Sequence, residues 1–237
     1  MWTHWLCHNY LRKARSPPQP LRVLDMCCGT GCIGVAIAKH VPTAHVTAVD
    51  LLPAAVATAR ENAAKNGVPP DRFDAQQSDM FELFFDPATK GDYPASAVGD
   101  GAAGAVQTPS VPVIADAHRG TFDVLVSNPP YVLPEQYVVL PLSILDWESK
   151  YGPRRRRLPR TQAVPLLQGV VRYGRVLLKP KHARHPALQE APNIAIEVGL
   201  QAHVVASIME KSGWFENVEV HLDYAQQERW VTASSKH

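Results

Sequence analysis

The sequence predicts an α/β fold: a doubly wound sheet of seven strands that is mostly parallel and closes with a C-terminal antiparallel hairpin. Three observations support this prediction. Short apolar runs alternate with segments of helical periodicity, as in strand–helix–strand units. A glycine-rich turn joins the first apolar run to the first helical segment. Residues 217–222 and 229–233 both alternate between apolar and polar positions and are joined by a polar turn, as expected for a hairpin.

Length and composition indicate one domain. The chain has 237 residues, of which 46% are hydrophobic and 19% are charged, enough for a single sizeable core. No apolar run approaches the length of about 18 residues that a membrane span needs. The four cysteines (Cys7, Cys27, Cys28 and Cys32) have no C-x-x-C spacing. We therefore expect reduced thiols in an intracellular compartment, no metal site and no membrane partner.

The first predicted element is a helix over residues 1–15, which ends before the prolines at positions 17 and 18. No acid precedes Asp25, and such a basic start is also found in organelle transit peptides. The tryptophans near one face of this helix favour a packed element instead. We expect residues 1–20 to form this helix and a linker, and residues 21–237 to form the main domain.

Two strand–helix units follow. The first strand, residues 21–25, leads through the glycine turn into a helix that ends at His40. The second strand, residues 45–50, ends in Asp50, an acid placed to accept two ribose hydroxyls. The next helix runs from about Pro53 to Asn66 and stops at a glycine.

Two cofactors fit the glycine turn. Gly29, Gly31 and Gly34 satisfy G-x-G-x-x-G, and Asp50 follows about twenty residues later, so a nicotinamide dinucleotide is one alternative. Asp25 stands just before the turn and would repel a pyrophosphate, while no basic residue in the turn offsets this repulsion. S-adenosylmethionine instead offers an ammonium and a sulfonium. The acid therefore favours S-adenosylmethionine.

The third strand is predicted over residues 73–77. At its end, Asp79 can accept the adenine amino group while Met80 or Phe81 packs on the ring; a surface Asp in a turn is the alternative. Residues 86–118 are rich in Gly, Ala, Pro and Ser, so we expect a flexible insertion there.

The fourth strand, residues 122–127, delivers Asn128-Pro129-Pro130-Tyr131 to the edge where open α/β sheets bind ligands. The prolines contribute carbonyl acceptors and no N–H donors. The Asn128 Oδ1 and the Pro129 carbonyl can therefore each accept one proton of an NH2 group, with the ring of Tyr131 as a wall. On the tetrapeptide alone, a strand-ending turn with a capping Asn remains an alternative.

Basic residues are concentrated in residues 149–189, which contain eleven of the 24 Lys and Arg and none of the 22 acids. Such segregation favours an anionic partner, a protein or an RNA, and a solvated loop fits equally well. The arginine run at 154–157 has few aromatic neighbours, so RNA is the less favoured partner. A helix over 165–178, a strand over 193–198 and a helix over 201–212 complete the predicted elements.

These motifs together resemble the HemK-like family of class I methyltransferases, which methylate the glutamine N5 of peptide-chain release factors. The resemblance is carried by the turn from Asp25 to Gly34, by Asp50 and Asp79, by the Asn-Pro-Pro-Tyr tetrapeptide at 128–131, and by the tail from Glu197 to Val231. It implies a Rossmann-like fold, with residues 21–237 as the domain that uses S-adenosylmethionine.

The resemblance also implies residue roles. Asp25, Gly29 and Gly31 would contact the methionine part of S-adenosylmethionine, Asp50 the ribose and Asp79 the adenine. The implied cofactor-binding set also includes Cys27, Thr30, Leu51, Met80 and Asn128. Substrate binding falls to Asn128, Pro129, Pro130 and Tyr131, of which Asn128, Pro129 and Tyr131 would be catalytic.

The implied reaction transfers a methyl group to a glutamine amide in the Gly-Gly-Gln loop of a release factor. An amide nitrogen is a poor nucleophile, and no Lys or His near the tetrapeptide offers a strong base, so catalysis would depend on positioning. The Asn-Pro-Pro-Tyr signature is shared with amino-methyltransferases of adenine or cytosine, so a nucleic-acid substrate stays open. A non-catalytic remnant of the fold also stays open.

The sequence departs from the family pattern at its start. Family members carry a helical recognition domain before the catalytic one, whereas this chain begins inside what would be the first catalytic-domain helix, so we expect a truncated lead-in. The insertion at 86–118 is longer than the usual connection, and the arginine run at 154–157 replaces an apolar segment. Cys27 with the run from Gly29 to Ile33 looks most like the eukaryotic mitochondrial branch, which predicts a mitochondrial location, with the cytoplasm as the alternative.

Overall fold

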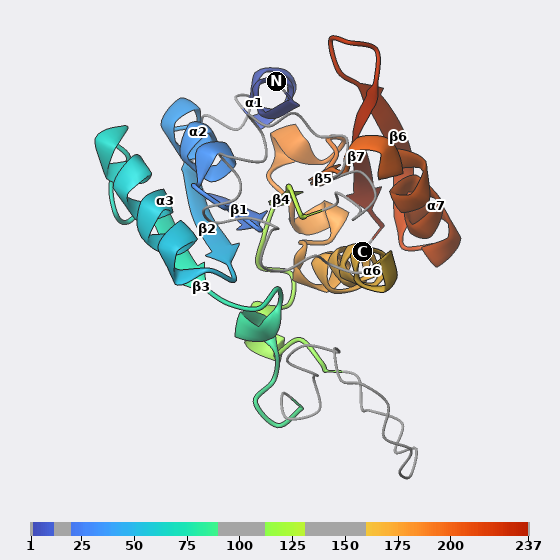
Figure 1. The fold of residues 1–237 in the computed structure, drawn as a ribbon, viewed down its shortest axis with the longest axis horizontal. Helices are drawn as coiled ribbons and strands as arrows, with labels where there is room; N and C mark the ends of the chain where they lie inside the picture. The colour runs from blue at the N-terminus through green and yellow to red at the C-terminus, as the bar shows by residue number, and fades with distance from the viewer. Residues whose placement is uncertain (1, 12–19, 90–111, 131–159, 237) are drawn as a thin grey trace.

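The fold is a seven-stranded sheet with helices on both faces (Figure 1). The computed structural model describes residues 2–11, 20–89, 112–130 and 160–236. The strand order is β3-β2-β1-β4-β5-β7-β6. Strands β1 to β5 pair in parallel, while β7 is antiparallel to both β5 and β6. The predicted doubly wound sheet with a closing hairpin is therefore confirmed.

Most of the predicted elements lie within one or two residues of their observed bounds. The strands are β1 (Leu21–Met26), β2 (Ala44–Asp50), β3 (Phe73–Gln77), β4 (Val124–Ser127), β5 (Ile194–Glu197), β6 (Phe215–Leu222) and β7 (Glu228–Ser235). The α-helices are α1 (Trp2–Asn9), α2 (Cys32–His40), α3 (Pro53–Lys65), α6 (Arg160–Leu177) and α7 (Ala202–Ser212). Single 3-10 turns include η2 (Glu82–Phe84) and η4 (Asp116–His118).

Two predicted helix bounds differ. Helix α1 ends at Asn9, because Leu6 and Leu11 are both fully buried, and residues five apart on a continuous helix point about 140° away from each other. The predicted extension over 12–15 lies outside the described residues. Helix α6 begins five residues before Pro165, which we had predicted to be its first residue. Pro165 is the sixth residue of α6, and its missing N–H costs the helix one backbone hydrogen bond.

The insertion predicted to be flexible over 86–118 is ordered at both ends. Phe85 and Ile114 form an antiparallel bridge, and Ile114 is only 2% exposed. The small-residue composition of the whole segment concealed the apolar residues that fasten it to the core. Residues 90–111 lie outside the described part.

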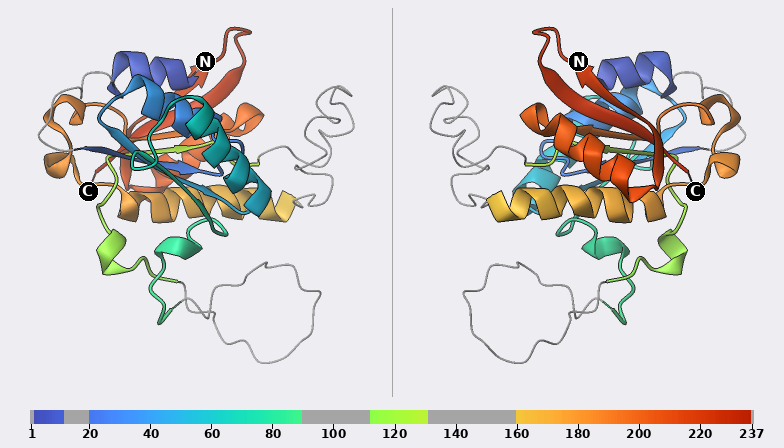
Figure 2. Two further views of the ribbon diagram at one scale, coloured as in Figure 1. Left: turned by 90° about the vertical axis from the view of Figure 1, so that its left-hand side faces the viewer. Right: turned by 90° about the vertical axis from the view of Figure 1, so that its right-hand side faces the viewer.

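Two apolar clusters fill the two sides of the sheet. Helices α1, α2 and α3 contribute to the first, with members such as Leu6, Ile37 and Ala59. Helices α6 and α7 contribute to the second, together with aromatic residues such as Phe81 and Phe84. Figure 2 shows α6 running along the opposite face of the sheet from α1 and α2. The sheet is thus covered on both faces, as parallel strands require.

The strand register sets the level of the chemistry-bearing residues. Met26, the last residue of β1, is paired with Val49 of β2 and with Ser127 of β4. Asp50 and Asn128 directly follow Val49 and Ser127 in the chain. They therefore stand at one level on the carboxyl edge of the sheet. The order in which strands are added to the sheet also reverses at β1, because β2 and β3 lie on one side of it and β4 lies on the other. Ligands bind at such switch points.

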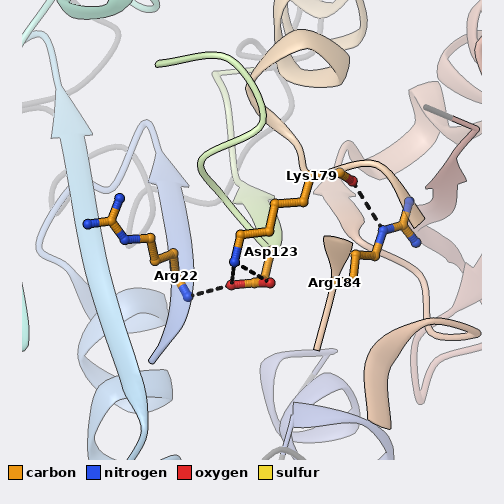
Figure 3. A network of polar contacts seen from close by, with 4 residues as sticks. All are labelled: Arg22, Asp123, Lys179 and Arg184. Carbon is orange, nitrogen blue, oxygen red and sulfur yellow. Dashed lines mark hydrogen bonds and ion pairs between the residues drawn. The ribbon is translucent and has the colours of Figure 1, made fainter. Parts of the chain in front are cut away.

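A buried ion pair between Asp123 and Lys179 joins elements at the amino edge of the sheet, opposite the switch point (Figure 3). The Asp123 carboxylate, in a residue only 2% exposed, accepts from the Arg22 backbone N–H at 2.8 Å and from Lys179 Nζ at 2.9 Å. Arg184 Nε donates to the Lys179 carbonyl at 3.3 Å. Arg184 Nη2 donates to the Ser235 carbonyl at 2.5 Å. This network ties together β1, β4, the segment after α6, and β7.

Part of the basic segment at 149–189 therefore has an internal role. Lys179 neutralises the buried Asp123 carboxylate, and Arg184 bonds the Ser235 carbonyl of β7. Lys181 pairs with Glu190. These three residues do not form the anionic-partner surface that their charge had suggested. Residues 154–157 lie outside the described residues.

We expect Lys179→Met to lower the free energy of unfolding by about 3 kcal/mol, because it leaves the Asp123 carboxylate buried without its cation. Urea denaturation measures the change. Lys181→Met is the matched control: it breaks the more exposed pair with Glu190 and should cost under about 1 kcal/mol. Equal losses in the two variants would show that burial of the Asp123 pair adds nothing.

Candidate active site

The glycine turn between β1 and α2 is built from left-handed backbone. Cys27, Gly29 and Gly31 have φ values of 58°, 54° and 76°. The Asp50 carboxylate accepts from the Gly29 N–H at 2.8 Å and from the Leu52 N–H at 2.9 Å. The acid at the end of β2 thus anchors the turn.

Asp25 lies beneath this turn and has no solvent exposure. Its Oδ2 accepts from the Gly34 N–H at 2.8 Å, while its Oδ1 is buried without a hydrogen-bond partner. Burial raises the pKa of Asp25 to about 7; the Gly34 N–H opposes this rise, and the charge of Asp50 adds to it. An acceptor of this kind is fitted to a cationic or N–H donor.

Two of the three motif glycines are required by close packing. A Cβ on Gly34 would lie 2.8 Å from Asp25 Oδ2 and 2.9 Å from Val46 Cγ1, and a Cβ on Gly31 would lie 2.9 Å from Ala59 Cβ. A Cβ on Gly29 would meet nothing within 4 Å. The space above Gly29 is therefore open, as a bound ligand needs, and the other two glycines bring the helices and strands together.

The ends of the first and third strands meet at sulfur atoms. Cys27 Sγ lies 3.6 Å from Met80 Sδ, and Met80 has a φ of 49°. Burial raises the pKa of the Cys27 thiol, and the charges of Asp50, Asp25 and Asp79 raise it further. All three predicted acids therefore lie close enough to Cys27 to act on its thiol.

The predicted acceptor residues lie on the other side of the switch point. Asn128 is exposed, Pro129 is buried and Pro130 is exposed. Ser127 Oγ donates to the Met26 carbonyl at 3.0 Å, which fixes the end of β4 against the end of β1. Tyr131, a predicted catalytic residue, lies outside the described residues.

Asn128 lines a pocket of about 360 Å³ together with the first turn of α2. Its lining residues are Thr3, Cys32, Ile33, Asn128, Glu197, Asp223, Tyr224, Arg229 and Trp230. The sequence predicted only Asn128 among them. Cys32 and Ile33 begin α2. The remaining lining residues come from α1, β5 and the β6–β7 hairpin, so their proximity depends on the sheet order. The only sequence signal for this group was the tail from Glu197 to Val231.

The turn of the hairpin is held rigidly beside this pocket. Asp223 Oδ1 accepts from the Ala225 N–H at 2.8 Å and from the Gln227 N–H at 3.1 Å, and its Oδ2 accepts from Arg229 Nε at 3.0 Å. The Gln227 N–H and the Arg229 guanidinium help to lower the pKa of Asp223, so it stays ionised. Tyr224 is 83% exposed at this turn.

Helix α1 forms another wall of the pocket. Its Trp5 ring lies 4.8 Å from the ring of His221 and 6.5 Å from that of Trp230, and the latter two rings stack at 5.3 Å. This aromatic group holds α1 against the hairpin, so that Thr3 reaches the pocket. The first helix is thus packed into the fold, as its tryptophans predicted.

The remaining predicted cofactor residues lie around the turn. Thr30 is exposed, and its carbonyl accepts from Asn62 Nδ2 at 2.9 Å. The Leu51 carbonyl accepts from Gln77 Nε2 at 3.3 Å. Their assignment to cofactor binding stays a prediction. All four cysteines are free, and no cluster of three or more metal-ligating side chains occurs within the described ranges.

Comparisons with known proteins agree on a family. A family model described as a methyltransferase domain matches residues 23–94. A release factor glutamine methyltransferase from Cereibacter sphaeroides is 28% identical over 212 residues, which cover 89% of this chain. These similarities support a HemK-like class I methyltransferase. The chain spans 58% of the length of the Cereibacter sphaeroides protein.

Two further similarities concern other methyltransferases. A ribosomal protein uL3 glutamine methyltransferase from Bordetella pertussis is 32% identical over 130 residues, 52% of this chain and 32% of that protein. The crystal structure of a ribosomal protein L11 methylase from Lactobacillus delbrueckii subsp. bulgaricus has a TM-score of 0.51 at 16% identity, covering 100% of this chain and 80% of that one. The structural likeness supports the fold. No helix in the described part of the chain is long and apolar enough to cross a bilayer.

The space around Gly34 beside the turn and around Gly169 in α6 predicts opposite effects of alanine at these two positions. Gly34→Ala should lower the free energy of unfolding by about 1–3 kcal/mol, because the new methyl group overlaps Asp25 and Val46. Gly169→Ala should raise it by about 0.5–1 kcal/mol, because Gly169 is inside α6 with nothing near its Cβ position. Chemical denaturation compares them. A neutral Gly34→Ala would contradict the close packing.

The buried Asp25 predicts an unusual pH dependence of stability. Its folded pKa of about 7 exceeds the ordinary 3.8, so the folded state binds the proton more tightly and stability falls as the pH rises from about 4 to about 7. In Asp25→Asn this slope should vanish. The wild-type minus variant difference in unfolding free energy should fall by about 2–3 kcal/mol between pH 5 and 8. Asp71→Asn, at an exposed site, is the control; a parallel pH profile for wild type and Asp25→Asn would contradict the raised pKa.

Proposed function

We propose that this chain transfers a methyl group from S-adenosylmethionine to the side-chain amide nitrogen of a glutamine in a peptide-chain release factor. The observation that carries the proposal is the shared edge of the sheet: the glycine turn after β1 and Asn128 after β4 end at one level, and Asn128 opens into a pocket with the start of α2. A cofactor and an NH2 acceptor group can thus meet at the switch point.

The hydrogen-bond acceptors around the turn fit S-adenosylmethionine. The orphan Oδ1 of Asp25 provides an acceptor under the turn, the space above Gly29 is open, and Asp50 and Asp79 supply further carboxylates. An acidic site of this kind repels a pyrophosphate and attracts an ammonium or sulfonium, which argues against a dinucleotide. The bound cofactor would supply a methyl group carried on sulfonium. Asp25 and Asp50 would hold its methionine part and its ribose.

Asn128 and Pro129 would hold the amide. Asn128 Oδ1 is an exposed acceptor at the strand end, and the Pro129 carbonyl follows it in a segment without backbone N–H donors at positions 129 and 130. The two acceptors would each take one proton of the NH2 group and so orient the nitrogen lone pair towards the methyl group. Positive charge that develops on the nitrogen is stabilised by the same oxygens.

Positioning would provide most of the rate enhancement. The pocket lining contains no Lys or His; its two carboxylates are Glu197 and Asp223, and Asp223 is already bound by Arg229. The neutral amide does not need to be deprotonated first if it is held in line with the methyl group, because effective molarity lowers the barrier. As the N–CH3 bond forms, the electron pair of the broken S–CH3 bond would stay on sulfur, and the nitrogen would then lose one of its protons to water. Pro129 is buried and Ser127 is bonded to β1, so the acceptor corner has little freedom to move.

The choice of a glutamine follows from the acceptor geometry together with the names of the relatives. An NH2 group is what two acceptor oxygens recognise, and the similar proteins are named as glutamine methyltransferases of release factors or of ribosomal protein uL3. A release factor is the proposed substrate because several of these relatives carry that name. The mitochondrial location stays a prediction, which imaging of the tagged full-length protein tests.

We expect Asn128→Ala to lower methyl transfer at least about a hundredfold, equivalent to about 3 kcal/mol, because the amide loses one of its two acceptors. Mass spectrometry of a release factor incubated with enzyme and S-adenosylmethionine measures the methyl group added to its Gly-Gly-Gln loop. S-adenosylhomocysteine should still raise the melting temperature of the variant, because Asp25 and the turn are unchanged.

Two controls make this test specific. Asn66→Ala, at the exposed end of α3, should leave transfer unchanged. Ribosomal protein uL3 and a short RNA serve as competing substrates. Methylation of uL3 or RNA in preference to the release factor would overturn the proposed substrate, and full turnover by Asn128→Ala would overturn the proposed role of Asn128.

A further inference from the structure

A second pocket lies on the opposite edge of the sheet from the candidate active site. It has a volume of about 410 Å³ and is lined by Arg119, Gly120, Arg175, Val176, Leu178 and Pro180. The turn after η4 and the end of α6 form it, joined by the Gly120 N–H, which donates to the Val176 carbonyl at 2.9 Å. Gly120 precedes β4 and Asn128 follows it, so about eight residues of extended chain, roughly 26 Å, separate the two sites.

The described residues that line this pocket carry positive charge and no negative charge. Arg119 and Arg175 both line it, and Arg172 is one helical turn from Arg175 on α6. No ion pair joins any of these arginines to an acid in the part of the chain that the structure describes. Burial lowers the pKa of Arg175, and the charges of Arg119 and Arg172 lower it further. Guanidinium groups that share one pocket repel one another unless an anion lies between them.

Arg175 is held in a fixed orientation. Its guanidinium carbon lies 4.0 Å from the centroid of the Trp214 ring, a cation–π contact at short range. Trp214 is itself fixed by hydrogen bonds of its backbone, from its N–H to Ser212 Oγ at 3.1 Å and to its carbonyl from the Lys236 N–H at 3.0 Å. Arg175 Nε is buried and has no hydrogen-bond partner. The planar donor group is therefore preorganised.

We propose that this pocket binds a phosphate group, supplied either by a free nucleotide or by an RNA strand. Two guanidinium groups at one mouth match the charge of a phosphate better than that of a single carboxylate, and their planar forks match its oxygens. The apolar side chains of Val176, Leu178 and Pro180 leave room beside the arginines for the group that carries the phosphate.

This site accounts for a part of the acid-free segment that the fold does not use. Lys179 and Arg184 of that segment are bound into the network of Figure 3 and Lys181 pairs with Glu190, whereas Arg172 and Arg175 face outward from α6 or into the pocket. The proposal is independent of methyl transfer. It concerns the amino edge of the sheet, and the cofactor and the amide are proposed for the carboxyl edge.

Titration of the full chain with sodium pyrophosphate tests the proposal, with tryptophan fluorescence as the signal because Trp214 contacts Arg175. We expect saturable binding that weakens at least tenfold in Arg175→Gln and in Arg119→Gln. Arg119 is exposed, so its loss should not affect folding. Lys65→Gln on α3 removes the same charge from an exposed site and should leave binding unchanged.

A second titration identifies the source of the phosphate. A ten-nucleotide single-stranded RNA that binds the wild type with strong salt dependence, and binds Arg119→Gln at least tenfold more weakly, supports an RNA phosphate. Pyrophosphate binding without RNA binding supports a free nucleotide. The proposal is overturned if pyrophosphate binding does not saturate, or if Lys65→Gln weakens it as much as Arg119→Gln does.

Discussion

The parallel register of β2, β1 and β4 is the constraint on which the site depends. It brings the ends of three strands to one level, so that Asp50 can anchor the Gly29 N–H while Asn128 opens into the neighbouring pocket. The buried pair of Asp123 and Lys179 secures the same strands at their other ends. A shift of β4 by one residue would reverse which of its side chains face each side of the sheet and would carry Asn128 away from this edge.

The carboxyl edge contains groups that lower the stability of the folded chain. Asp25 is buried with one oxygen unpartnered, and Cys27 and Met80 adopt left-handed backbone next to it. A carboxylate without full compensation destabilises the folded chain and at the same time gives the site an unused acceptor. The amino edge shows the opposite arrangement around Asp123, where every carboxylate oxygen is bonded. An unpartnered carboxylate oxygen and left-handed backbone thus occur together at the edge where the cofactor is proposed to bind.

Local patterns predicted most of the secondary structure and part of the site. β3 and the start of α3 were predicted at their observed residues, and Asp25, Asp50 and Asn128 were found from their places at strand ends. The errors have common causes. The ends of the 86–118 insertion are held by a bridge to Ile114 that its average composition concealed, and α1 stops early because Leu6 and Leu11 both enter the core. Long-range packing decided both cases.

The sequence by itself determined the strand and helix pattern, the glycine turn and the acidic and amide groups at the strand ends, because each depends on residues that are neighbours in the chain. Only the tertiary structure decided that α1, β5 and the hairpin complete the pocket of Asn128, and that Arg119 faces Arg175. Those contacts join segments separated by tens of residues. They follow from the strand order and from helix packing, which no local pattern of side chains encodes.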